Sequence, residues 1–303
     1  MEGARAGLSV DTSTTGLSIP QKLKAHINNV ALHHTLFDLP YAFLAALLAT
    51  DGHPGIWNLV WIALAITSGR AAALAMDNLV DLRYDKQQPR MSYRAMVKGE
   101  ITPTEAKVFI IVMLGIMVLA VLQLAPICIY LLPVAALPCL IYPYMKRVTG
   151  WVHMFLGLAI AMAPAGGWVG VTGEVTLPLI VLCTAVALWI GAFDAMYGAQ
   201  DEEFDRAHGL HSLAVSYGAR GAFRIASACH VLCIGLFVLL GTMLGLGALY
   251  YFSVFLAGCV LLYQHMIVTP TDFHRVTQAY FMRNSLVPLV MLVCTWIDFV
   301  MRA

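Results

Sequence analysis

Charged residues are scarce in this sequence. Lys, Arg, Asp and Glu together make up 12% of its 303 residues, whereas soluble globular domains carry about 25%. Hydrophobic residues reach 60%, and apolar runs recur from about residue 36 to residue 300. So few charges cannot cover the surface of a soluble protein, and a single membrane anchor would confine the apolar excess to one segment. The sequence therefore predicts an integral membrane protein.

An excess of either charge sign is also absent. The 18 basic and 17 acidic residues leave a net charge of +1, which argues against nucleic acid as a partner. The seven cysteines all fall inside apolar runs, and no close Cys-x-x-Cys pair occurs among them. This pattern predicts neither a zinc knot nor a disulfide framework, and it is typical of small packing side chains.

The first 34 residues lack the continuous apolar core of a cleaved secretory signal. Residues 1–34 are polar and are predicted to form a flexible arm and a short interfacial helix. Because a membrane span needs about 20 mostly apolar residues, residues 35–303 are predicted to form one domain of nine transmembrane helices. The predicted spans are 36–50, 57–78, 104–123, 126–145, 150–170, 175–196, 221–243, 246–268 and 279–300.

The connections between these spans alternate in character. Those after the first, third, fifth and seventh spans are a few residues long and contain no Lys or Arg, whereas the others are long and charged. Lys and Arg concentrate in cytosolic loops. The pattern therefore predicts a cytosolic N-terminus, a C-terminus on the far side of the cell (inner) membrane, and long loops that all lie at the cytosolic face.

The acidic residues are concentrated in two places. Eight of the 17 lie in two windows, at the ends of the second and sixth spans, about 120 residues apart. Each window contains an Asp-x-x-x-Asp pair, Asp81/Asp85 and Asp201/Asp205, and residues four apart on a continuing helix share one face. The repeated order of helix, Asp pair, polar loop and next span indicates a pseudo-repeat that brings two helix pairs face to face.

Two facing pairs of carboxylates repel each other unless cations lie between them. Mg²⁺ takes oxygen ligands and commonly bridges one or two carboxylates to substrate phosphates, and it neutralises the charge that develops on a leaving group. The four aspartates therefore predict a diphosphate site that holds Mg²⁺. The alternative is that they are ordinary solvated acids at helix ends, which explains one such pair more easily than two on the same side.

Basic side chains that could bind the same diphosphate are present. Arg70 lies inside the second span, two turns before Asp77, and an arginine inside a span is costly enough to mark a functional site. Lys146 and Arg147 end the fourth span, where anchoring at the membrane surface accounts for Arg147 and in part for Lys146. Ring faces, which attract a cation, are offered near this site by Tyr142, Tyr144 and Tyr197.

The two aspartate windows resemble the Asp-rich motifs of the UbiA superfamily of intramembrane aromatic prenyltransferases. The first reads Asp77-Asn-Leu-Val-Asp81-Leu-Arg-Tyr-Asp85, and the second reads Tyr197-Gly-Ala-Gln-Asp201-Glu-Glu-Phe-Asp205. The second motif, extended from Phe193-Asp194 to Ser212, is similar to that of 4-hydroxybenzoate polyprenyltransferases and of menaquinone-pathway enzymes that prenylate a dihydroxynaphthoate. The likeness covers the chain from about residue 25 to residue 300.

The resemblance implies an all-α membrane protein, a bundle of nine transmembrane helices around a central cavity with a cytosolic cap. It also implies that Mg²⁺ and diphosphate are held by Asp81, Asp85, Asp201 and Asp205, and that Arg70 and Lys146 help to bind the diphosphate. One position departs from the family motif, which has Asn where this chain has Asp77 followed by Asn78. Asp77 is therefore expected to add a ligand, or Asn78 to replace the missing amide, and both are predicted to bind substrate.

The predicted reaction is transfer of a polyprenyl group from a polyprenyl diphosphate to an aromatic acid within the lipid bilayer. The expected acceptor is 4-hydroxybenzoate, as in ubiquinone-type quinone biosynthesis, and a dihydroxynaphthoate is the alternative. Tyr142 or Tyr197 is expected to hold the allylic cation, and Asp194 to accept the ring proton. A membrane transporter is the alternative from another class, but transporters place their charges near the midplane, often on interrupted helices.

Overall fold

The structure is a computed structural model that describes residues 18–30, 35–273 and 283–302. Within these ranges the chain is helical, and an isolated bridge between Thr269 and Asp272 is the only β-type pairing. Part of the predicted arm, residues 1–17 and 31–34, lies outside the described residues, as does the beginning of the last predicted span, residues 279–282. The boundary between arm and domain at residue 35 stays a prediction.

Seven of the described helices are long and apolar enough to cross a membrane. They are α3 (Ile56–Asp85), α4 (Pro103–Val121), α5 (Ile127–Met145), α6 (Val152–Thr172), α7 (Leu177–Gly198), α9 (Leu213–Met243) and α10 (Ala248–Ile267). Two further apolar helices, α2 (Thr35–Ala49) and α12 (Leu286–Arg302), have 15 and 17 residues. The predicted all-α membrane bundle is confirmed, whereas the count of nine spans is not.

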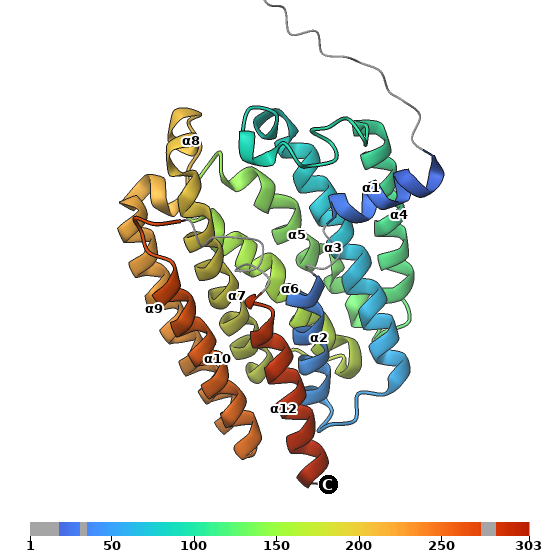
Figure 1. Cartoon of the computed structure of the whole chain (residues 1–303). Helices are drawn as coiled ribbons and strands as arrows, with labels where there is room; N and C mark the ends of the chain where they lie inside the picture. Colours follow the sequence, from blue (N-terminus) through green and yellow to red (C-terminus); the bar gives the residue numbers. More distant parts are fainter. Residues whose placement is uncertain (1–17, 31–34, 274–282, 303) are drawn as a thin grey trace, which may run out of the picture.

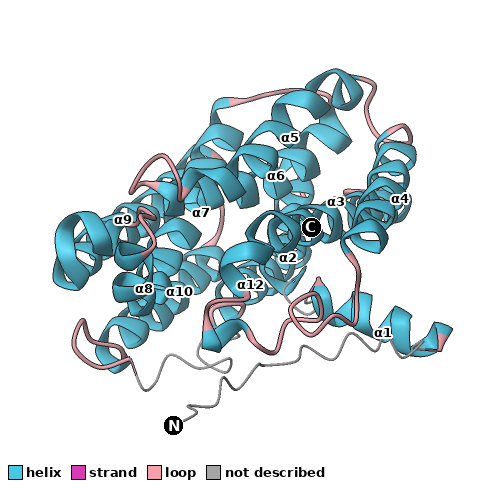
Figure 2. Ribbon diagram, turned by 90° about the horizontal axis from the view of Figure 1, so that it is seen from above, coloured by secondary structure: helices cyan, strands magenta, loops and turns pink. Residues whose placement is uncertain are grey.

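The two ends of the bundle differ in what covers them. The long helices run alongside one another in Figure 1, and α1 (Ile19–Asn29), α8 (Glu202–Ala207) and the loop 86–102 all lie at its upper end. Figure 2 shows the bundle from above, with α1 lying in the plane of the view beside the long helices. This upper end is the predicted polar cap, and both Asp-rich motifs lie in it.

Helix α7 is the central element of the bundle. In its apolar window 72% of the residues are buried, against 6% for α5, and it packs on α6 and α9. Close approach of α6 depends on Gly157, since a Cβ there would lie 2.2 Å from the carbonyl oxygen of Ala187. The second motif therefore follows the most firmly held helix, while the exposed apolar side chains of α5 face the lipid.

The two Asp pairs differ in local structure. Helix α3 continues to Asp85, two turns beyond the predicted end of its span, so the first motif lies on one continuous helix as expected. The second does not, because α7 ends at Gly198 and a 3-10 turn, η3 (Ala199–Asp201), leads into α8. The side-chain amide of Gln200 donates to the carbonyl of Tyr197 at 2.8 Å, and so binds a carbonyl that a continuing helix would use. The second Asp pair therefore does not lie on one regular α-helix, unlike the first.

Candidate active site

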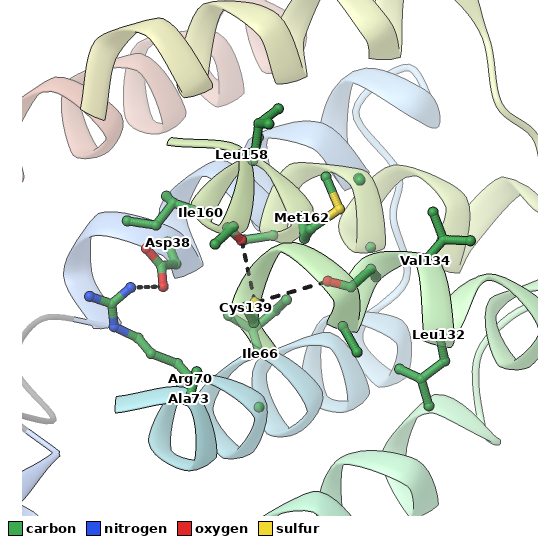
Figure 3. A pocket seen from close by; sticks show the side chains of 18 of the residues that line it. Asp38, Ile66, Arg70, Ala73, Leu132, Val134, Cys139, Leu158, Ile160 and Met162 are labelled. Atoms are coloured by element: carbon green, nitrogen blue, oxygen red, sulfur yellow. Dashed lines mark hydrogen bonds and ion pairs between the residues drawn. The ribbon is translucent and has the colours of Figure 1, made fainter. Parts of the chain in front are cut away.

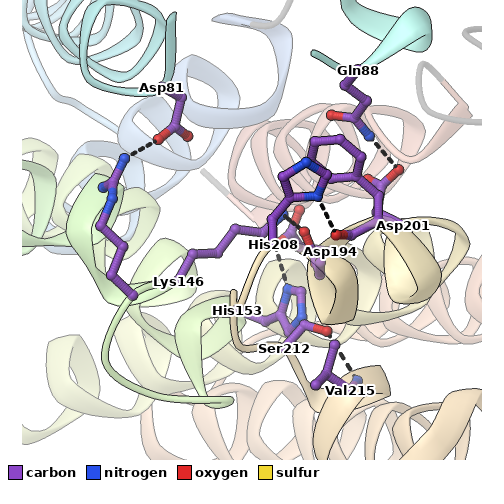
Figure 4. Close-up of polar contacts among 12 residues, drawn as sticks. Asp81, Gln88, Lys146, His153, Asp194, Asp201, His208, Ser212 and Val215 are labelled. Atoms are coloured by element: carbon purple, nitrogen blue, oxygen red, sulfur yellow. Dashed lines mark hydrogen bonds and ion pairs between the residues drawn. The ribbon is translucent and has the colours of Figure 1, made fainter. Parts of the chain in front are cut away.

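Two adjacent cations at the end of α5 connect the two Asp-rich motifs. Lys146 Nζ lies 3.0 Å from Asp205 Oδ1, in the second motif. Arg147 Nη2 lies 2.8 Å from Asp81 Oδ1, in the first. The guanidinium also contacts the ring faces of Tyr84 and Tyr144. Carboxylates that are 120 residues apart in sequence are thus held at one end of the bundle, as the pseudo-repeat predicted (Figure 4).

The loop after α3 makes a second connection between the motifs. Gln88 Nε2 donates to Asp201 Oδ1 at 2.8 Å, and this contact joins the loop to the second motif (Figure 4). Arg94 Nη1 lies 2.5 Å from Asp85 Oδ2, which closes the same loop back onto the first motif. The loop 86–102 therefore covers the carboxylates with hydrogen-bond donors instead of leaving them to solvent.

The carboxylates keep both partly buried cations charged. Burial lowers the pKa of Lys146, but the negative charges of Asp205 and Asp201 raise it, and the net shift is upward. Arg94 is shifted upward in the same way, because Asp85 and Asp77 outweigh the effect of burial on its pKa. Two positively charged side chains therefore lie among the carboxylates and can donate charge-assisted hydrogen bonds to a diphosphate.

Below this end of the bundle lies an apolar cavity of about 840 Å³, lined mainly by α3, α5, α6 and α7. Asp77 and Tyr142 line it from α3 and α5. Asp77 lies one helical turn before Asp81 on α3, so the cavity ends close to the first-motif carboxylates. An apolar chain in the cavity and a charged group among the carboxylates could therefore belong to one ligand.

Arg70 faces this cavity and not the carboxylates. Its guanidinium forms an ion pair with the buried Asp38 of α2 on the cavity wall (Figure 3). Along α3 it lies about 10 Å from Asp77, since seven residues rise by that length. Arg70 was predicted to bind the diphosphate, and the structure does not bring it to the other predicted diphosphate ligands.

Three other predicted residues are placed as follows. The amide of Asn78 donates to the backbone carbonyl of Asn29 at 2.7 Å, so it holds α1 against α3 and does not face the cavity. Tyr197 stacks on Phe193 within α7. Asp194 Oδ2 lies 2.7 Å from Nδ1 of His153, a side chain of α6. Asp194 also interacts electrostatically with both Tyr142 and Lys146.

The donor set suits Mg²⁺. The four motif aspartates offer only oxygen, the ligand that this ion prefers, and Asp205 Oδ2 is buried without a hydrogen-bond partner. In the described part of the chain, no three His, Cys, Asp or Glu side chains converge on one point. The ion would therefore take one or two carboxylates and complete its shell with phosphate oxygens and water.

Sequence reasoning missed several residues of the site. Arg94 and Gln88 were read as part of a polar loop, Asp38 as part of an apolar run, and Arg147 as a surface anchor. His153 is a polar residue in an apolar run, but nothing in its spacing indicates a partner on α7. The presence of a basic residue nine positions after Asp85 was the one available signal for Arg94.

A bundle of membrane-crossing helices, with an apolar cavity that ends at paired aspartates, defines the class of an intramembrane enzyme for apolar diphosphates. Residues 39–286 match the UbiA prenyltransferase family. The chain belongs to this family, and it is therefore a membrane-embedded prenyltransferase.

Relatives and solved structures agree with this assignment. A protein of Citrobacter koseri named 4-hydroxybenzoate octaprenyltransferase is 30% identical over 80% of this chain and 84% of its own length. The apo structure of a UbiA homolog from Aeropyrum pernix K1 is 28% identical and superposes with a TM-score of 0.80 over 88% of this chain and 98% of that chain. The structure of a UbiA homolog from Archaeoglobus fulgidus bound to GPP and Mg²⁺ is 15% identical, covers 91% of this chain and 99% of that one, and shares the fold with a TM-score of 0.73.

The contact between Lys146 and Asp205 predicts a measurable loss of stability. Lys146→Met leaves the Asp205 carboxylate, whose side chain is 1% exposed, without its cation. Breaking a fully buried pair in this way costs about 3–5 kcal/mol. One third of the lysine side chain is exposed, so we expect about 2 kcal/mol, measured by denaturant unfolding in detergent micelles.

The matched control is Lys98→Met, which removes a half-exposed lysine 4.0 Å from Glu100 and should cost less than about 0.5 kcal/mol. Adding Asp205→Asn to Lys146→Met should recover part of the loss, because the buried charge is then gone. Equal stability of the two lysine variants would contradict the proposed link between α5 and the second motif.

Proposed function

We propose that this protein transfers a polyprenyl group from a polyprenyl diphosphate to 4-hydroxybenzoate and releases diphosphate. The observation that carries the proposal is the pair Lys146–Arg147, which joins the two Asp-rich motifs at the end of an apolar cavity. This arrangement provides one site for a charged head group and another for its long apolar chain. The printed name of the Citrobacter koseri relative supports 4-hydroxybenzoate as the acceptor.

The diphosphate lies among the motif carboxylates in this proposal. Asp81, Asp85, Asp201 and Asp205 would hold Mg²⁺, with one or two of these carboxylates on each ion, and the bound metal would neutralise the charge of the leaving diphosphate. Lys146 and Arg94 donate hydrogen bonds to the phosphate oxygens and share that charge. The electron pair of the breaking C–O bond moves to the diphosphate oxygen, and these cations stabilise it there. The Archaeoglobus fulgidus homolog whose structure holds GPP and Mg²⁺ has the same fold.

The cavity holds the prenyl chain and the acceptor ring. Its apolar walls exclude water, which would otherwise capture the allylic cation. The ring face of Tyr142, at the end of the cavity nearest the carboxylates, stabilises that cation, and Tyr197 on α7 is a second aromatic candidate for this role. Asp77 adds a carboxyl group at the same end of the cavity.

Carbon–carbon bond formation leaves a proton on the attacked ring carbon. Asp194 is the proposed acceptor of that proton, because it interacts with Tyr142 and Lys146 from α7. Loss of the proton restores the aromatic ring. In this alkylation the polar cap binds the diphosphate, and the apolar cavity holds the prenyl chain and the acceptor ring.

We further propose that the cap faces the cytosol. The long charged connections that the structure describes in full, 86–102 and 199–212, lie at the cap end, and Lys and Arg favour the cytosolic side. A C-terminal alkaline phosphatase fusion should then be active, since the end of α12 lies at the opposite end of the bundle (Figure 1). An inactive phosphatase fusion together with a fluorescent C-terminal GFP fusion would reverse the orientation.

Substitution of the second motif tests the diphosphate site. Asp201→Ala removes a carboxylate that holds Gln88 and the proposed metal, and we expect loss of turnover by at least about 100-fold. The assay uses purified protein in detergent with radiolabelled geranyl diphosphate and Mg²⁺. The unfolding midpoint of the variant serves as the control for folding. Wild-type turnover by this variant would refute the proposed site.

The same assay identifies the acceptor. Parallel reactions contain 4-hydroxybenzoate or a dihydroxynaphthoate, each with and without Mg²⁺. We expect Mg²⁺-dependent label on 4-hydroxybenzoate. Label on the dihydroxynaphthoate alone would keep the reaction and replace the acceptor, and no label on either would contradict the proposed function.

A further inference from the structure

A slot for one side chain is built into α7 beside the proposed site. Gly191, Asp194 and Gly198 follow one another at intervals of three and four residues, so they share one face of the helix. A Cβ added to Gly198 would lie 3.0 Å from Cε1 of His153, and one added to Gly191 would lie 3.0 Å from the His153 carbonyl oxygen. The two glycines therefore leave room for this histidine against α7, directly at the carboxylate of Asp194.

The histidine in this slot is removed from solvent. His153 is 2% exposed, and its Nδ1 lies 2.7 Å from Asp194 Oδ2, with the ring pointing at the carboxylate in Figure 4. A carboxylate only accepts hydrogen bonds, so Nδ1 is assigned as the donor. His153 Nε2 is buried and has no hydrogen-bond partner. The ring is therefore held by its single hydrogen bond to Asp194.

The bond to His153 engages only one oxygen of Asp194. The other oxygen, Oδ1, belongs to a side chain that is 23% exposed. Asp194 lies seven residues, or two turns, before Asp201 on the helix that leads to the second motif. Tyr142 and Lys146 interact electrostatically with it from α5. The carboxylate is thus held from one side by α6 and lies within electrostatic range of Tyr142 and Lys146 of α5.

We infer that His153 is a positioning residue, which fixes the carboxylate of Asp194 so that its Oδ1 removes the proton from the alkylated ring. The inference rests on the proposed function. The C–O bond to diphosphate breaks first, and the ring carbon then bonds to the resulting allylic cation. The C–H bond at that carbon then breaks, its electron pair restores the aromatic ring, and its proton bonds to Asp194 Oδ1. His153 keeps its own proton and its hydrogen bond throughout.

Three substitutions of His153 separate this role from packing. His153→Asn keeps an N–H donor near the position of Nδ1, His153→Phe keeps a ring but removes the donor, and His153→Ala removes both. The readouts are kcat, the KM of each substrate, and the kinetic isotope effect with 4-hydroxybenzoate deuterated at the two carbons ortho to its hydroxyl. The isotope effect reports breakage of the ring C–H bond, which a role in folding alone would not make rate-limiting.

We expect kcat to fall by about 100-fold in His153→Phe and His153→Ala with KM values unchanged, and the isotope effect to rise from near one to clearly above one. His153→Asn should retain most of the wild-type kcat. Gly198→Ala, which crowds the ring, should act in the same direction as His153→Phe.

Two results would overturn the inference. One is wild-type kcat in His153→Phe, and the other is a lower kcat with an isotope effect that stays near one in every active variant. If His153→Ala does not fold, His153→Phe decides, because it preserves the volume of the side chain. Failure of the wild-type enzyme to label any acceptor would refute the proposed function. An active wild type with an equally active His153→Phe variant would refute only the inference about His153.

Discussion

The arrangement of this enzyme depends on opposing charge at the end of an apolar bundle. Carboxylates from two distant parts of the chain lie together there, and their mutual repulsion has to be offset. Lys146 offsets the charge of the second motif and Arg147 that of the first, since each forms an ion pair with a different motif. Arg94 and Gln88 add a cation and a donor from the loop above. The protein thus holds an array of alternating charges in which a metal and a diphosphate can replace some of the internal contacts.

The membrane-embedded part positions this charged end. Helix α7 is buried on most sides and carries both Asp194 and the start of the second motif. Helix α5 is exposed to lipid over most of its length, yet it contributes Tyr142 to the cavity and Lys146 to the carboxylates. An apolar substrate can therefore occupy the cavity while its head group lies among the carboxylates at the end of α3 and after α7. The helices that cross the membrane also carry the residues of the proposed active site.

Sequence periodicity predicted most of the fold, because spans of apolar residues are a strong signal. It also predicted the two motif pairs, since Asp81/Asp85 and Asp201/Asp205 differ sharply from their apolar surroundings. It could not pair Arg70 with Asp38, or His153 with Asp194, because those contacts join helices whose rotation is set by packing, as at Gly157. It also missed the break after Gly198, where a side-chain amide competes with the helical hydrogen bonds.

The central claim is that the two motifs form a single diphosphate site. It is tested most directly by the Kd of a non-reactive thio analogue of geranyl diphosphate, with and without Mg²⁺, in the wild type, Asp81→Asn, Asp205→Asn and the double variant. If both motifs form one site, either single substitution already disrupts it. The account therefore predicts Mg²⁺-dependent binding and a Kd for the double variant that is scarcely higher than the Kd of either single variant. Losses that add in the double variant, or binding that is indifferent to Mg²⁺, would contradict the account.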